Sequence, residues 1–185
     1  MTAAPDGDRA VAARAVETWV AEACAAEGVT SDLGARPGEY VVQLPGEHKL
    51  RTTVSLLLGD HGLSLSAFVV RHPDENEAGL HRWLLRRNTK LRQVAFAVDG
   101  SGDVFLVGRL PLVGVTTHTL DDVMGEMLGV ADSSFDELLS LGFAASIRRE
   151  WAWRTSRGES TSNLEAFRHL VRHEPVPDPR TIPGG

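Results

Sequence analysis

Seven histidines are the residues of this 185-residue chain best suited to binding a metal or moving a proton. None is spaced as HxH or HExxH, the patterns that bring two imidazoles to one metal ion. His61, His72 and His118 fall in expected turns or at strand ends, where polar side chains are common, and an enzyme that combines them in space remains an alternative. The single cysteine, Cys24, excludes an internal disulfide and a cysteine-based zinc site.

Nucleophilic and nucleotide chemistry lack their sequence signatures. The GxSxG pattern of many hydrolases is absent from the sequence. Gly100-Ser101-Gly102 resembles the start of a dinucleotide-binding loop, but that loop leads into a helix, and a strand is expected here. We therefore predict that the chain is not an enzyme and that it has no catalytic, cofactor-binding or metal-binding residues.

Two clusters of basic residues are the strongest candidates for a binding surface. The first lies on an expected helix that ends near residue 90, and the second lies beside two tryptophans near residue 150. A basic face can dock an acidic partner or a phosphate, and arginine with exposed tryptophan is typical of interface hot spots. A solvated helix face, and tryptophans that close the core, are the alternative interpretations. The predicted interaction residues are Arg82, Arg86, Arg87, Lys90, Arg148, Arg149, Trp151 and Trp153.

Composition narrows the class of protein. The formal net charge is -6, which argues against a general nucleic-acid binder, because phosphate binding needs a basic surface. No apolar run is long enough to cross a membrane, and the N-terminus has no apolar core of a signal peptide. We expect a cytoplasmic protein that does not enter a membrane.

Hydrophobic periodicity predicts the elements that position the basic clusters. Asp8 is expected to cap a helix that runs to about Glu27, with one apolar stripe containing Val16, Trp19 and Val20. A loop over residues 30–38 follows. Strands at residues 40–44, 50–58 and 63–70 are joined by short turns, which predicts an antiparallel meander. A helix over residues 75–90 then carries the first basic cluster.

The second half of the chain centres on a hairpin at residues 94–112. Its glycine turn separates two strands that are apolar on both faces, so Phe96, Val98, Phe105 and Val107 are expected mainly in the core. Thr119 is expected to start the last helical region, and residues 119–150 are either one long helix or two short ones. We predict a disordered N-terminus at residues 1–8, a folded domain at 9–153 and a polar, proline-rich, largely disordered tail at 154–185.

The element order and the segment RRNTKLRQVAFAVDGSGDVFLVGRLPL resemble the YbjN-type family of bacterial sensory-transduction regulators, in its actinobacterial form. The resemblance covers residues 9–153. It implies an α+β fold like that of type III secretion chaperones: a five-stranded antiparallel sheet flanked by helices, in the order α-β-β-β-α-β-β-α. It also implies a homodimer, because chaperones of this fold are dimers that bind extended segments of a partner.

Two functions follow as expectations. The first is a non-enzymatic protein-interaction or chaperone-like module, a dimeric regulator that binds a polypeptide partner through an edge strand or an apolar face. The alternative is a regulator that senses a small anionic ligand through the basic helix at residues 82–92.

Overall fold

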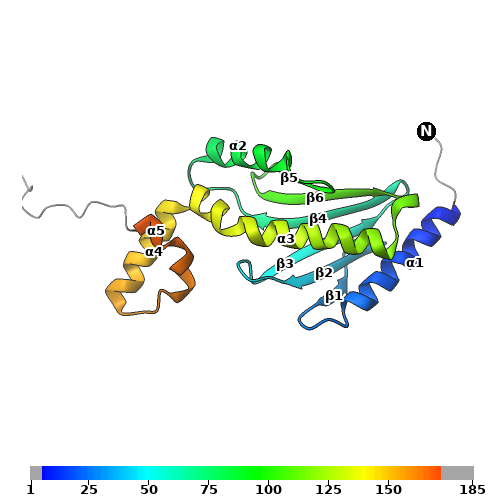
Figure 1. Cartoon of the computed structure of the whole chain (residues 1–185), viewed down its shortest axis with the longest axis horizontal. Coiled ribbons are helices and arrows are strands. Elements are labelled where there is room, and N and C mark those ends of the chain that lie inside the picture. Colours follow the sequence, from blue (N-terminus) through cyan, green and yellow to red (C-terminus); the bar gives the residue numbers. More distant parts are fainter. Residues whose placement is uncertain (1–5, 172–185) are drawn as a thin grey trace, which may run out of the picture.

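A six-stranded antiparallel sheet organises residues 6–171, the part of the chain that the computed structural model describes (Figure 1). The strands lie in the order β1-β2-β3-β4-β6-β5. Strands β1 to β4 form a meander, and the β5–β6 hairpin extends it because β6 pairs with β4. The strands are β1 (Thr30–Leu33), β2 (Glu39–Pro45), β3 (Arg51–Leu58), β4 (Gly62–Val70), β5 (Val94–Val98) and β6 (Val104–Pro111).

The longest helix, α3 (Thr117–Gly142), lies across the sheet in Figure 1. It runs in roughly the direction of β4 and β6, and its 26 residues span about 39 Å at 1.5 Å per residue, longer than the nine-residue strand β4 at about 3.3 Å per residue. The other helical elements are α1 (Asp6–Ala23), α2 (Glu77–Asn88), η1 (Leu112–Gly114), α4 (Ala144–Arg157), η2 (Ser162–Phe167) and α5 (Arg168–Val171). Figure 1 shows α4, η2 and α5 beyond the end of the sheet.

The two faces of the sheet differ in burial. On the inner face, which packs against the helices, nearly all side chains of the four strands β3 to β6 are buried; this set includes Val54, Leu56, Leu65, Leu106 and Phe96. On the outer face, the side chains of these strands are half-buried or exposed. Alternation along the strands produces this division, with one irregularity in β4, where the register shifts between Phe68 and Val70 and Val69 and Val70 are both buried.

The antiparallel α+β class is confirmed, but the predicted count of five strands is wrong. The additional strand is β1, which lies in the segment expected to be a loop. Its sequence, Thr-Ser-Asp-Leu, has no apolar alternation, because it is an edge strand whose side chains are mostly exposed. In the sheet it pairs with β2, and Cys24 Sγ donates a hydrogen bond to Ser31 Oγ at 3.2 Å.

Helix boundaries differ from the sequence expectation by a few residues. The α1 helix begins at Asp6, so Asp8 lies inside it and is not its cap, and it ends at Ala23. The apolar stripe of α1 is confirmed, since Val16, Trp19 and Val20 are buried. Thr116 rather than Thr119 is the N-cap of α3, and the two threonines form a reciprocal capping box.

Residues 119–150, expected to form either one long helix or two short ones, belong to one long helix, α3, and to the start of a second helix, α4. The α3 helix continues through Asp132-Ser133-Ser134 and ends at Gly142, and α4 starts at Ala144. Helical structure also occupies residues 154–157 and 162–171, in the segment expected to be a tail, and Phe167 is buried. The expected proline-rich end at 172–185 and residues 1–5 lie outside the described residues.

The β5–β6 hairpin is confirmed as a hairpin, but only part of it is core. Phe96 is buried, whereas Val98 is 41% exposed. Phe105 and Val107 are half-buried on the outer face of the sheet. The apolar pattern predicted burial of both faces, while the helices of this chain cover only one.

Candidate functional site

The β5 edge of the sheet is closed by the side chain of Asn88, the last residue of α2. Asn88 Oδ1 accepts a hydrogen bond from the Phe96 backbone N–H at 2.7 Å, and Asn88 Nδ2 donates to the Phe96 carbonyl at 3.1 Å. The side-chain amide thus offers the donor and acceptor that a neighbouring strand would offer. Another strand cannot pair along the middle of β5 without displacing Asn88.

The opposite edge, formed by β1, is open. Among residues 6–171, no hydrogen bond from another segment reaches the outward backbone groups of β1. The Gly34 N–H donates to the Glu39 carbonyl, so Gly34 directs its backbone groups towards β2. In an antiparallel pair every second residue does so, and the backbone groups of Ser31 and Leu33 therefore point away from β2. The Leu33 side chain is 79% exposed. Unpaired groups of this kind are a template for an added strand.

A charged network fixes the β1–β2 hairpin that presents this edge. Glu39 is 8% exposed, and its carboxylate accepts hydrogen bonds from Arg36 Nη2 at 2.7 Å and from Ser55 Oγ at 2.5 Å. Hydrogen bonds from Arg36, followed by that from Ser55, lower the pKa of Glu39 to about 2. The Glu39 side chain also fills the space beside Gly34 that a Cβ atom there would need. These contacts fix the conformation of the loop between β1 and β2 and tie it to β3.

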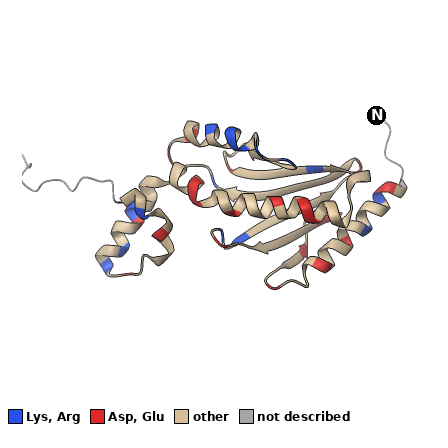
Figure 2. Cartoon of the chain, viewed as in Figure 1, with Lys and Arg blue, Asp and Glu red and all other residues tan. Residues whose placement is uncertain are grey.

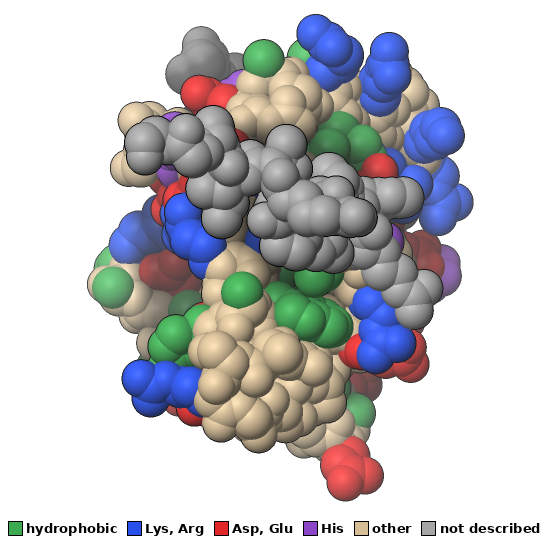
Figure 3. Space-filling view, turned by 90° about the vertical axis from the view of Figure 1, so that its left-hand side faces the viewer, with side chains coloured by type: hydrophobic (Ala, Val, Ile, Leu, Met, Phe, Trp, Pro, Cys, Tyr) green, Lys and Arg blue, Asp and Glu red, His purple; other side chains and the backbone are tan. Residues whose placement is uncertain are grey.

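The predicted basic cluster on α2 forms a surface of its own. Trp83, Arg86 and Arg87 share one side of α2 at i, i+3 and i+4. With Lys90, in the turn after the helix, and Glu137 of α3 they line a hollow of about 280 Å³. Arg82 is exposed and lies outside this set of lining residues. Figure 2 shows basic bands on α2 and acidic bands on α3, and Figure 3 shows basic side chains gathered at the upper right, at the height of α2.

The cations on α2 and in the turn after it have no acidic partner in the described part of the chain. Neither Arg82, Arg86, Arg87 nor Lys90 forms an ion pair there. Glu137, the carboxylate in the hollow, accepts a hydrogen bond from Trp83 Nε1 at 2.6 Å instead. The arrangement can receive an anion.

The second predicted cluster lies on α4 and lines a separate hollow. Arg149 and Trp153 line it together with Ser146 and Glu150. Trp153 is 45% exposed, and the guanidinium of Arg157 lies 4.7 Å from the centre of its ring. In the same helix Arg148 and Trp151 are both half-buried. The two predicted clusters therefore form two surfaces, not one.

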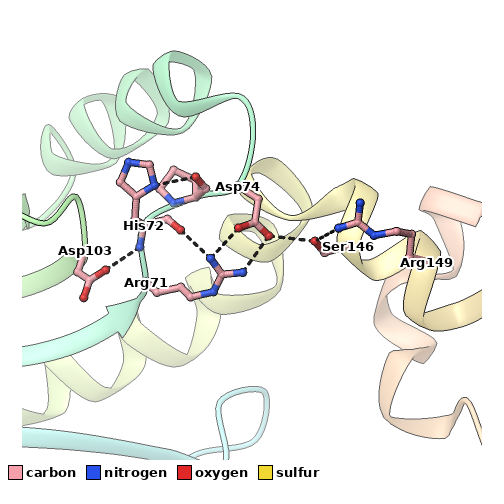
Figure 4. A network of polar contacts seen from close by, with 7 residues as sticks. Arg71, His72, Asp74, Asp103, Ser146 and Arg149 are labelled. Carbon is pink, nitrogen blue, oxygen red and sulfur yellow. Dashed lines mark hydrogen bonds and ion pairs between the residues drawn. The ribbon is translucent and has the colours of Figure 1, made fainter.

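A polar network joins α4 to the segment between β4 and α2 (Figure 4). The Asp74 carboxylate accepts two hydrogen bonds from Arg71, at 2.7 and 2.8 Å, and one from Ser146 Oγ at 2.9 Å. Arg149 Nη2 in turn donates to Ser146 Oγ at 2.9 Å. The hydrogen bonds from Arg71, and then that from Ser146, lower the pKa of Asp74 to about 2. Arg149 thus takes part in positioning α4 as well as in lining its hollow.

The histidines do not come together. His61 and His118 line different hollows, and the His72 ring contacts the carbonyl of Pro73 at 2.8 Å. Among the described residues, no group of three or more histidine, cysteine, aspartate or glutamate side chains is arranged to hold a metal ion. No helix within residues 6–171 has both the length and the apolarity needed to span a membrane.

Sequence reasoning missed the residues that distinguish the two edges. The sequence did not mark Asn88 as a residue that closes a sheet edge, because polar residues are common at the ends of helices. Its contact with Phe96 depends on how α2 packs against β5. Glu137 was missed for a similar reason, since it meets Trp83 across 54 positions of the chain.

Comparison with known proteins finds a family model and relatives that match most of this chain. The model of a protein family, "YbjN: Putative bacterial sensory transduction regulator", matches residues 16–140. An uncharacterised protein of Mycobacterium leprae is 49% identical over 134 residues, covering 72% of this chain and 73% of that protein. An uncharacterised protein of Mycobacterium tuberculosis strain H37Rv is 50% identical over 137 residues, covering 74% and 75%.

Two solved structures resemble the fold. The HopA1–SchA chaperone–effector complex contains a chain with a TM-score of 0.49 and 14% identity, covering 69% of this chain and 95% of that one. The heterodimeric ExoU–SpcU complex from the type III secretion system of Pseudomonas aeruginosa gives a TM-score of 0.41 and 15% identity, covering 69% and 98%. Identities this low carry no function from those chains to this one.

Proposed function

Because this chain belongs to the YbjN family, we propose that it is a non-enzymatic, dimeric regulator that binds a polypeptide partner in the cytoplasm. The partner binds as an extended segment that adds as a seventh strand beside β1. Main-chain hydrogen bonds supply affinity in this mode of recognition, and alternate side chains supply specificity.

The observation that carries the proposal is the difference between the two sheet edges. Asn88 occupies the backbone groups of Phe96 on β5, while Ser31 and Leu33 on β1 present theirs to solvent. A strand that is short and carries a charge resists unspecific pairing, and β1 has four residues including Asp32. Its edge can therefore stay open without leading to aggregation.

The side chains of β1 define the partner's chemistry. Asp32 faces the outer side of the sheet and Leu33 the inner side, and both are exposed. Opposite charges and apolar pairs are favourable across neighbouring strands. The partner segment should therefore place a lysine or arginine beside an apolar residue.

The experiment uses peptides selected from a random display library on the full chain, with binding measured by fluorescence anisotropy. Leu33→Pro removes an outward N–H and is tolerated on an edge strand, so it should weaken binding at least about tenfold. Leu33→Ala keeps the N–H and is the matched control, which should retain most of the affinity. Equal binding by the Leu33→Pro protein, or failure to select any peptide, would count against strand addition at β1.

A second candidate function rests on the hollow between α2 and α3. Three cations without an ion-pair partner converge there beside an indole, which favours a phosphate-bearing ligand as the signal that the regulator senses. Inorganic phosphate should raise the melting temperature of the wild-type protein and of the Arg82→Glu control, but not of Arg86→Glu. An equal shift in all three proteins would show that the surface is only a solvated face.

The α4 cluster is proposed as an auxiliary contact for the polypeptide partner. Trp153 is exposed beside Arg149 and Arg157, the residue types that dominate interface hot spots. Trp153→Ala should weaken binding of a long partner segment while leaving a short peptide at β1 unaffected.

A further inference from the structure

The outer face of the sheet is accessible across its central strands. On β3, β4, β5 and β6, none of the outward-facing side chains is buried, although nearly all of their inward-facing neighbours are. The α1, α2 and α3 helices pack on the inner face, so nothing within residues 6–171 covers the centre of the outer one. An antiparallel sheet that faces water commonly carries polar side chains on this side, and here serines share the face with alanine, valine and phenylalanine side chains.

The centre of the outer face is uncharged, and small polar side chains alternate there with apolar ones. One row of paired residues crosses five strands without a charge: Ala95, Val107, Ser66, Ser55 and Val41. In the next row Phe105 pairs with Phe68, and their rings meet edge to face with centres 5.6 Å apart. Phe68 is 41% exposed. Together with Ala97, Val107 and Ala95 on the neighbouring positions of β5 and β6, these rings form a contiguous apolar patch, and such patches mark sites of association.

Charge on this face favours a second copy of the chain as the occupant. Charged residues make up 24% of the sequence, yet they reach this face only towards its margins. Glu39 is neutralised there by Arg36 at 2.7 Å, and Lys49 donates hydrogen bonds to the carbonyls of Phe68 and Val69. Two identical faces can therefore meet without placing like charges opposite each other at the centre.

The size of the face matches that of a stable interface. The strands β1 to β6 have 4, 7, 8, 9, 5 and 8 residues. At about 3.3 Å per residue and about 4.8 Å between strands, they give a face of roughly 650 Å². Specific interfaces bury about 800 Å² per partner, with a range of roughly 600 to 1,000 Å². The outer face alone is large enough.

We infer that two copies of the chain pack outer face against outer face about a two-fold axis, with the Ala95–Val41 row at the centre. This inference rests on the proposed dimer and assigns its interface. Two sheets pack in this way about 10 Å apart with nearly aligned strands. The helices then form the two outside layers, and the β1 edges and the hollows between α2 and α3 stay accessible to partners.

The test measures molecular mass by light scattering and sedimentation at micromolar concentration. Wild type should be a dimer, and Ser66→Arg should weaken the dimer by roughly 100-fold, because it buries an unpaired charge at the centre of the interface. Ser133→Arg makes the same change at an exposed position of α3 and should leave the dimer intact. Ala95→Arg is the second variant if Ser66→Arg does not fold.

The outcomes separate this inference from the proposed function. A monomeric wild-type protein would overturn the dimer and its interface together. A dimer that survives in a folded Ser66→Arg or Ala95→Arg protein would overturn the assigned interface alone. If monomeric Ser66→Arg still binds a library-selected peptide, strand addition at β1 is supported without the dimer. If Leu33→Pro loses the peptide but keeps the molecular mass of wild type, the loss of binding is not caused by loss of the dimer.

Discussion

The side-chain amide of Asn88 forms two hydrogen bonds with the backbone of Phe96, at 2.7 and 3.1 Å, and so stands in for a seventh strand at the β5 edge. The structure thereby leaves β1 as the edge available for pairing. This one side chain makes the two edges of the sheet unequal.

Loss of the Asn88 amide should destabilise the fold and open the β5 edge. Asn88→Ala leaves the N–H and carbonyl of Phe96 without partners, which should lower the free energy of unfolding by about 1–3 kcal/mol. Asn88→Asp keeps the acceptor for the Phe96 N–H but sets a carboxylate oxygen against the Phe96 carbonyl, so it too should be less stable than wild type. Urea denaturation measures both values. Equal stability of Asn88→Ala and wild type would show that water replaces the amide without loss.

The turn between β5 and β6 requires glycine at one of its two glycine positions. Gly102 has a φ of +87°, and a Cβ atom there would lie 2.0 Å from the ring of His72. Gly102→Ala should therefore destabilise the protein by roughly 2 kcal/mol.

Gly100 supplies the matched control for that substitution. A Cβ atom at Gly100 meets nothing within 4 Å, so Gly100→Ala should change stability by no more than about 0.5 kcal/mol. Thermal unfolding of the two variants, two positions apart in one turn, makes the comparison. Similar melting temperatures would contradict this account of the hairpin.

Stability should fall in acid because two carboxylates are held ionised. Arg71 and Ser146 lower the pKa of Asp74 from 3.8 to about 2, and Arg36 and Ser55 lower that of Glu39 from 4.5 to about 2. A depressed folded-state pKa contributes stability above the unfolded-state pKa, and this is lost as pH falls through the folded-state value. The free energy of unfolding should therefore decrease between about pH 4.5 and 2.

Asp74→Asn isolates the contribution of the contact between α4 and the segment that joins β4 to α2. The variant should be less stable than wild type near neutral pH and should lose less stability on acidification. Denaturation curves at several pH values measure the difference. Parallel pH profiles for the two proteins would mean that Asp74 does not titrate with a depressed pKa.

Local pattern was enough to predict much of the fold. Period-two alternation located β2, β3, β4 and the hairpin, and the stripe at Val16, Trp19 and Val20 identified the buried side of α1. The β1 strand was missed because its exposed side chains carry no alternation. Phe105 and Val107 were expected in the core because an apolar pattern does not reveal how many faces the helices cover.

The candidate surfaces depend on contacts that no local pattern reports. The sequence identified Arg86, Arg87 and Lys90 as a basic group, but not the hollow they form with Glu137. The contrast between the edges of β5 and β1 depends on where the end of α2 packs, which is set by the tertiary structure.

Amide hydrogen exchange of the full chain, with and without a library-selected peptide, tests the central claim most directly. Strand addition at β1 predicts that the peptide slows exchange at the Ser31 and Leu33 amides, whose N–H groups point away from β2, while Phe96 is unchanged because Asn88 already holds it. Unchanged exchange at Ser31 and Leu33, with new protection elsewhere, would contradict the account.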